Sequence, residues 1–159
     1  MDYITDPEVT KAPIHLVGLQ IQNQENLDMH PDYSISDPMA KLTKDGDIDI
    51  QIFCYLFLDD DFINNNQNIP QYIYLTVLTD SKPQRYLAQQ YGELPTDIGH
   101  FIEYSFHIKI SSSLINKYNI RKVRIIGSVI ARTEPSAGIS ESLRAGRFLN
   151  TVLPVGGKN

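Results

Sequence analysis

The sequence predicts an all-β fold: a mostly antiparallel β-sandwich of five to seven strands, with one short helix near residues 81–91. The composition is the first reason, since nine Tyr and six Phe, together with many Ile, Val and Thr, favour strands. The second reason is that several segments alternate apolar and polar residues, which is the pattern of a half-buried strand. The third is that strands and helices do not alternate regularly along the chain, which argues against a parallel sheet covered by helices.

The chain length suits one domain. A chain of 159 residues buries about 70% of its unfolded surface, enough for a core without metal or disulfide support. We expect residues 14–155 to form the single β-sandwich domain. Residues 1–13, bounded by Pro7 and Pro13, are expected to be an extended arm, and residues 156–159 a frayed C-terminus.

The first predicted strand covers residues 14–22, where apolar residues recur at every second position. The residues expected on its inward face are Val17, Leu19 and Ile21. Residues 23–39 are polar and contain two prolines, so they predict a long loop. Residues 40–43 predict a short edge strand.

Two central strands follow. Residues 48–58 alternate at first and become apolar on both faces from Phe53 onward, as in a strand that runs from an edge into a buried centre. The acidic and Asn-rich residues after 58 predict a loop. Residues 71–79 predict the next strand, with one inward face. The residues expected on that face are Ile73, Leu75 and Val77.

The predicted helix covers residues 81–91. Ser81 and Gln84 have the spacing of a capping box, and Pro83 falls in the first turn. Gly92 is suited to closing the C-terminal end.

The remaining chain predicts three more elements with strand periodicity. Residues 100–110 alternate cleanly, and residues 111–119 predict a turn or a single helical turn. Residues 120–132 predict a long strand with an apolar centre, and residues 133–146 a flexible loop. Residues 147–155 predict the last strand. We expect the outer surfaces of the resulting sheets to be free for docking.

The single cysteine, Cys54, excludes an intrachain disulfide and lies within an apolar strand, so we expect a buried, unreactive thiol. The N-terminus lacks an apolar signal region, and the longest apolar run, residues 52–58, is far shorter than a membrane-spanning helix requires. These features favour a soluble intracellular protein, cytoplasmic or part of a virion.

The net charge of −5 conceals an uneven distribution. Residues 1–80 hold fourteen acidic and three basic side chains, whereas residues 81–159 hold five acidic and eleven basic side chains. The candidate basic patch consists of Lys117, Arg121, Lys122, Arg124, Arg132, Arg144 and Arg147. Three interpretations stay open: the charges mix over the surface, two oppositely charged faces join copies head to tail, or the patch contacts nucleic acid or an anionic membrane.

Clustered carboxylates raise the question of calcium, which takes six to eight oxygen ligands. Residues 26–42 contain Asp32 and a Ser-Asp-Pro sequence with Asp37, and this stretch is similar to the first calcium loop of C2 domains. The resemblance covers about a tenth of the chain and implies ligands at Asp32, Asp37, Asp59 and Asp61. Asp32 stands one residue closer to Asp37 than in that family, and solvated loop acids are the preferred interpretation.

No catalytic spacing emerges. The four histidines, His15, His30, His100 and His107, form no pair with the spacing of a zinc site. The sequence contains neither a nucleophile elbow nor a phosphate-binding glycine loop. We therefore predict no cofactor and no small-molecule substrate.

Three function classes remain. The preferred hypothesis is a non-enzymatic structural or assembly protein with protein partners, which forms a homo-oligomer or docks to a virion, phage or secretion complex. The second is a monomeric adapter or a C2-like module that binds calcium or lipid. The third is an enzyme whose site is assembled from scattered acids and histidines.

Overall fold

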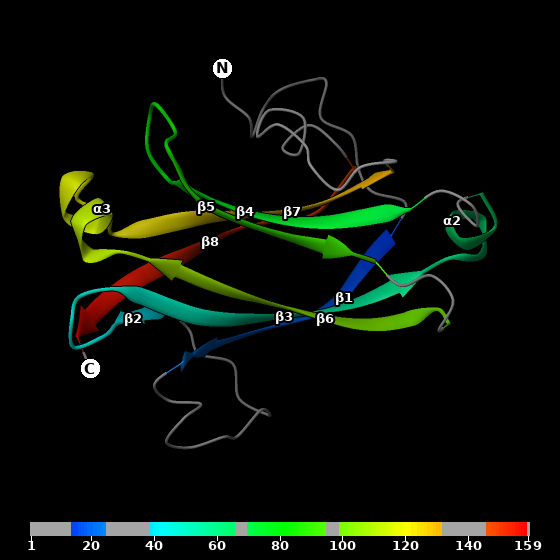
Figure 1. Cartoon of the computed structure of the whole chain (residues 1–159), viewed down its shortest axis with the longest axis horizontal. Coiled ribbons are helices and arrows are strands. Elements are labelled where there is room, and N and C mark those ends of the chain that lie inside the picture. Colours follow the sequence, from blue (N-terminus) through cyan, green and yellow to red (C-terminus); the bar gives the residue numbers. More distant parts are fainter. Residues whose placement is uncertain (1–13, 25–38, 66–69, 95–98, 132–145, 159) are drawn as a thin grey trace.

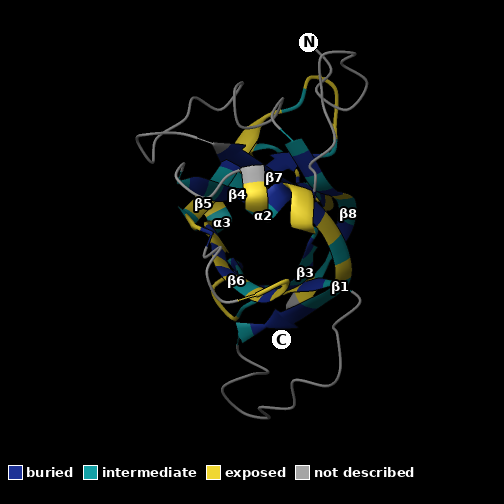
Figure 2. Ribbon diagram, turned by 90° about the vertical axis from the view of Figure 1, so that its right-hand side faces the viewer, coloured by how far each residue is buried: buried dark blue, intermediate teal, exposed yellow. Residues whose placement is uncertain are grey.

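The computed structural model describes residues 14–24, 39–65, 70–94, 99–131 and 146–158. Within them the chain forms two β-sheets that pack face to face, with two short helices (Figures 1 and 2). The predicted all-β class is therefore confirmed. The expected arm at 1–13 and the loop expected at 133–146, except for its last residue, lie outside the described residues.

The smaller sheet has three antiparallel strands in the order β1-β3-β6, and the larger has five in the order β2-β8-β7-β4-β5. Only the pairing of β2 with β8 is parallel. The smaller sheet contains β1 (Ile14–Asn23), β3 (Ile48–Leu58) and β6 (Phe101–Ile110). The larger contains β2 (Ala40–Leu42), β8 (Gly146–Lys158), β7 (Lys122–Ala131), β4 (Gln71–Thr79) and β5 (Tyr86–Glu93). The described residues thus hold eight strands rather than five to seven.

The core lies between the sheets. Every second residue of β3 is buried, and these side chains pack in one cluster with the inward residues of β4, β6 and β7. Ile73, Leu75 and Val77 of β4 are buried, as the alternation predicts. Figure 2, seen from the α2 end, shows the two layers.

The sequence predicted a strand covered on both faces at 48–58 and a strand with one inward face at 71–79. The structure shows the opposite. β3 alternates along its whole length, so Phe53, Tyr55 and Phe57 are half-buried on an outer face instead of lying in a doubly covered centre. β4 is buried at every position from Ile73 to Thr79. The expectation that both sheets have free outer surfaces is therefore wrong for β4, whose apolar residues occupy both faces.

The prediction of a helix at 81–91 is wrong. These residues form a turn followed by β5, which pairs antiparallel with β4 from Tyr72–Glu93 to Leu78–Tyr86. The Thr79 N–H donates to the Arg85 carbonyl, and the Arg85 N–H donates to Thr79 Oγ1, so both residues close the hairpin. Pairing with the edge of β4 outweighs the local helix propensity of this segment, because strand pairing satisfies the backbone of both segments.

Three smaller differences concern strand phase and strand ends. Val17 is 59% exposed because a bulge between Leu16 and Gly18 shifts the phase of β1. β8 continues to Lys158, so residues 156–158 form part of a strand instead of a frayed end. The loop expected after β3 begins with helix α2 (Asp60–Asn65).

The two helices lie at opposite ends of the long axis of the molecule (Figure 1). Helix α3 (Ser112–Lys117), within the predicted turn, is held to the start of β3 by a hydrogen bond from Ser112 N–H to Asp47 Oδ1. Helix α2 follows the end of β3, whose eleven residues span about 35 Å. No helix among the described residues is long and apolar enough to cross a bilayer.

Candidate functional site: two oppositely charged ends

The end of the molecule at α3 carries exposed basic side chains. The β4–β5 hairpin, α3 and the start of β7 meet there because β4 ends opposite the start of β7, with Thr79 paired to Val123. We define the basic end as Arg85, Lys117, Arg121, Lys122 and Arg124. All of them are exposed except Arg124, which is half-buried.

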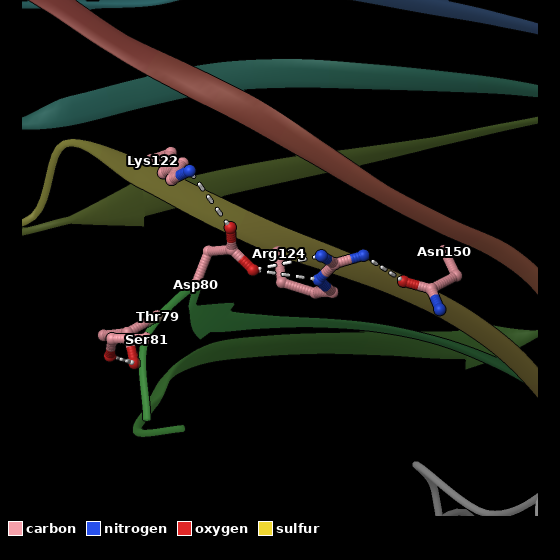
Figure 3. Close-up of polar contacts among 6 residues, drawn as sticks. All are labelled: Thr79, Asp80, Ser81, Lys122, Arg124 and Asn150. Atoms are coloured by element: carbon pink, nitrogen blue, oxygen red, sulfur yellow. Dashed lines mark hydrogen bonds and ion pairs between the residues drawn. The ribbon is translucent and has the colours of Figure 1, made fainter. Parts of the chain in front are cut away.

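One carboxylate, Asp80, is enclosed by this end (Figure 3). Its Oδ1 accepts hydrogen bonds from Nε and Nη2 of Arg124 at 3.2 and 3.0 Å. Its Oδ2 lies 3.7 Å from Lys122 Nζ, and Arg124 also donates from Nη1 to Asn150 Oδ1 at 2.9 Å. Asp80 therefore pairs with both Arg124 and Lys122, and its single negative charge offsets one of their two positive charges.

Tyr118 contacts two of the other cations of the basic end. The Arg85 guanidinium lies 5.7 Å from the centroid of the Tyr118 ring, and Lys117 Nζ lies 5.4 Å from it, both within range of a cation–π interaction. Tyr118 also lines a pocket of about 140 Å³ whose wall includes Asp80, Arg121 and Lys122. The Arg121 side chain has no carboxylate or ring partner among the described residues.

The structure brings together four residues of the predicted basic patch: Lys117, Arg121, Lys122 and Arg124. It separates Arg147 from them, because β7 and β8 are antiparallel and Arg147 pairs with Ser128 while Lys122 pairs with Pro154. Arg147 is also buried, at 9% exposure. Arg132 and Arg144 lie outside the described residues. Sequence reasoning missed Arg85, since the hairpin that positions it was predicted to be a helix.

The opposite end, at α2, is acidic. Asp59 precedes the helix and accepts a hydrogen bond from Phe62 N–H at 2.9 Å, the role of a helix cap. Asp60 and Asp61 follow in the first turn, where carboxylates interact favourably with the helix dipole, and both are exposed. Local structure thus explains why three acids stand in a row.

Beside these acids lies an open pocket of about 440 Å³. We call it the aromatic–acidic pocket; it is lined by Phe57, Asp59, Asp60, His100 and Phe101. The two phenyl rings lie 5.1 Å apart between centroids, and Phe101 is 72% exposed. His100 Nε2 lies 2.5 Å from Asp60 Oδ1, and the imidazole stacks 6.0 Å from the Phe57 ring.

A second histidine completes the surface around this pocket. His15 pairs with Phe57 across β1 and β3, stacks at 6.0 Å from its ring, and places Nε2 3.7 Å from Asp59 Oδ2. In the pairing of β3 with β6, Phe57 pairs with Phe101, so Phe101 lies on the side of Phe57 opposite His15. The sequence held one signal for this site: Phe101 is an apolar residue on the otherwise polar face of β6.

Two of the four proposed calcium ligands, Asp32 and Asp37, lie outside the described residues. Of the others, Asp59 caps α2 and Asp61 is exposed on it. The described part of the chain contains no group of three His, Cys, Asp or Glu side chains suited to a metal. The remaining His–Asp contact described, His107 with Asp49, lies on the outer face of the smaller sheet.

Cys54 faces the core and is fully buried, as expected. Burial raises the pKa of its thiol to about 12, because the thiolate would lose its hydration there. The thiol is therefore protonated at neutral pH and is a poor nucleophile.

No family model matches the sequence, and no curated protein matches it. Matches among solved structures include a beta-glucosidase from Listeria innocua in complexes with gluconolactone, isofagomine and glucose, at 10%, 9% and 10% identity. The TM-scores are 0.36, 0.38 and 0.37, and each match covers 89% of this chain and 16% of the other. The chain thus spans about a sixth of the length of those proteins, and a likeness of this size supports no functional statement.

Proposed function

We propose that this protein is a non-enzymatic assembly component whose copies join end to end, the basic end of one against the acidic end of the next. One observation carries the proposal: at the α3 end of the long axis the five basic residues outnumber the neighbouring carboxylates Asp47 and Asp80, while α2 at the other end begins with Asp60 and Asp61 after Asp59. The ends are separated by the length of β3, about 35 Å, several times the Debye length of ~8 Å at physiological salt. Each end therefore acts on a partner independently of the other.

The chemistry of both ends favours docking. The acidic residues Asp60 and Asp61 and the basic residues Lys117 and Arg121 are exposed, so they are available to a second copy. Complementary potentials accelerate encounter and fix orientation. Since the contact joins two different surfaces, it is heterologous and builds rings or filaments rather than a closed two-fold dimer.

An intracellular or virion setting forms part of the proposal. A single buried, unpaired cysteine supports it, because exported proteins of small size commonly rely on disulfides.

Sedimentation velocity of the purified chain at low and high salt tests the proposal. We expect concentration-dependent oligomers at low salt that dissociate as salt rises, because screening weakens contacts between exposed charges. The double variant Lys117→Glu/Arg121→Glu should remain monomeric. The control Lys41→Glu/Lys109→Glu makes the same change in net charge at exposed positions of β2 and β6 that are not among the five residues of the basic end, and it should weaken association less.

A wild-type chain that stays monomeric at low salt and high concentration would refute end-to-end assembly. Binding of that monomer to anionic vesicles or to an oligonucleotide, lost in the Lys117→Glu/Arg121→Glu variant, would instead favour a monomeric binding module that uses the basic end.

A further inference from the structure

We infer that the aromatic–acidic pocket is a receptor for a guanidinium group, and that its occupant is Arg121 of a second copy of this chain. The inference rests on the proposed end-to-end assembly and names the contact at its centre. It is carried by the lining of the pocket and by the partners of each cation at the basic end.

The lining of the pocket selects a cation. Asp59 and Asp60 repel anions, and a neutral apolar ligand would use the phenyl rings but leave the carboxylates without a new partner. A cation uses both, through hydrogen bonds to the carboxylates and through its position over a ring face. The contact with His100 occupies only Oδ1 of Asp60, and a carboxylate has about four acceptor sites, so Asp60 retains capacity for a further donor.

A guanidinium fits this lining better than an ammonium. It is planar and weakly hydrated, stacks on aromatic rings, and pairs with a carboxylate through two parallel hydrogen bonds. Phe101 presents a ring that is 72% exposed next to carboxylates from the start of α2. An ammonium keeps its strong hydration and cannot stack as a plane.

Within the basic end, Arg121 is the free arginine. Arg124 is held by Asp80 and Asn150, and Arg85 lies over Tyr118. Arg121 is exposed and its side chain has no partner among the described residues, so it enters a partner's pocket without breaking an internal contact. The Arg121 carbonyl accepts a hydrogen bond from Val155 N–H, which fixes the backbone from which the side chain projects.

A double-mutant cycle on self-association tests the contact. Phe101→Ala and Arg121→Lys should each weaken association about tenfold, the size of a central interface residue. Because both variants remove the same contact, the double variant should be little weaker than either single variant. The matched control is Val17→Ala, another exposed apolar side chain of the smaller sheet, which should change the dissociation constant less than twofold. Arg85→Lys gives a comparison within the basic end: because Arg85 is held over Tyr118, its exchange should weaken association less than that of Arg121.

A titration with N-acetyl-arginine amide, followed by NMR, tests the pocket without self-association. We expect chemical-shift changes at Phe101 and His100, weaker changes with the lysine analogue, and none at the pocket of the Phe101→Ala variant. If the wild type associates but Arg121→Lys and Phe101→Ala do not weaken it, the inference is overturned and the proposed function stands. If the wild type does not associate at all, the proposed function and this occupant both fail.

Discussion

The two ends of the molecule use their charges differently. At the basic end, Asp80 lies inside the cluster and binds Arg124 and Lys122, so part of the positive charge is neutralised within the fold. At the acidic end no lysine or arginine contacts Asp59 or Asp60 among the described residues; their neighbours are His15 and His100. The acidic end therefore keeps its charge, while the basic end offers only some of its cations.

This difference distinguishes the cations that stabilise the fold from the cations that are available to a partner. A cation that is held inside the fold contributes to the folded state, whereas an exposed cation without a partner is available to another molecule. Arg124 belongs to the first kind and Arg121 to the second, although they lie three positions apart. Counting charges in the sequence cannot distinguish them, because the distinction depends on which residues the hairpin brings near.

The largest expected effect comes from exchanging the charges of the two ends. The variant Lys117→Glu/Arg121→Glu cancels the excess positive charge of the basic end, and Asp60→Lys/Asp61→Lys reverses the charge at the start of α2, so each alone should associate at least about 100-fold more weakly than the wild type. A mixture should associate again, because the unchanged acidic end of the first variant then meets the unchanged basic end of the second. Sedimentation velocity of the separate and mixed variants measures this. Failure of the mixture to associate would show that the substitutions act by damaging the surface rather than by charge.

A second prediction concerns the charge held inside the basic end. Asp80→Asn leaves Arg124, which is 18% exposed at its side chain, without its carboxylate, and should lower the free energy of unfolding by about 1–2 kcal/mol. Lys122→Gln removes an exposed partner at 3.7 Å and should cost under ~0.5 kcal/mol. Urea unfolding measures both. Self-association of Asp80→Asn should strengthen at low salt, since the basic end becomes more positive. If Asp80→Asn weakened both the fold and self-association, the distinction between stabilising and docking charges at the basic end would be wrong.

How far the sequence predicts the fold depends on what each pattern encodes. Alternation located β1, β3 and β6, because one covered face forces a period of two. It could not assign which central strand is covered on both faces: β3 and β4 are both rich in apolar residues, and the choice depends on what packs outside each sheet. β5 was missed because Leu87, Ala88, Gln89 and Gln90 favour a helix locally, and only the open edge of β4 makes them a strand.

The site was predictable only where its residues are close in sequence. Lys117, Arg121, Lys122 and Arg124 were grouped correctly because eight positions of chain cannot separate them far. Arg147 was grouped wrongly, since strand direction carries it to the other end of β7. The aromatic–acidic pocket was not predicted, because it depends on the register of three strands.

A third prediction uses Cys54, which lies in β3 between the two ends and serves as an internal reference. The pKa of its thiol is about 12 in the folded state, above the ordinary value of 9.0. Between these values the unfolded chain binds fewer protons than the folded chain, so stability falls as pH rises, by at most ~1.4 kcal/mol per pH unit. The variant Cys54→Val should lack this slope. The free energy of unfolding of both proteins, measured between pH 9 and 12, gives the difference between their two slopes. Groups that titrate equally in both proteins do not contribute to that difference. Equal slopes would contradict a buried, protonated thiol.

The smallest effect separates two similar His–Asp contacts on the smaller sheet. His100 contacts Asp60 and stacks on Phe57 at the acidic end, whereas His107 contacts Asp49 away from the pocket. Both histidines are 45% exposed, so their contacts contribute little to stability and either variant to Ala should change it by under ~0.5 kcal/mol. Association should respond differently: His100→Ala removes a side chain that orients Asp60 and should weaken association about threefold, or ~0.6 kcal/mol, while His107→Ala should leave it unchanged. Equal responses would mean that docking uses the whole outer face of the sheet, and the acidic end would lose its distinct role.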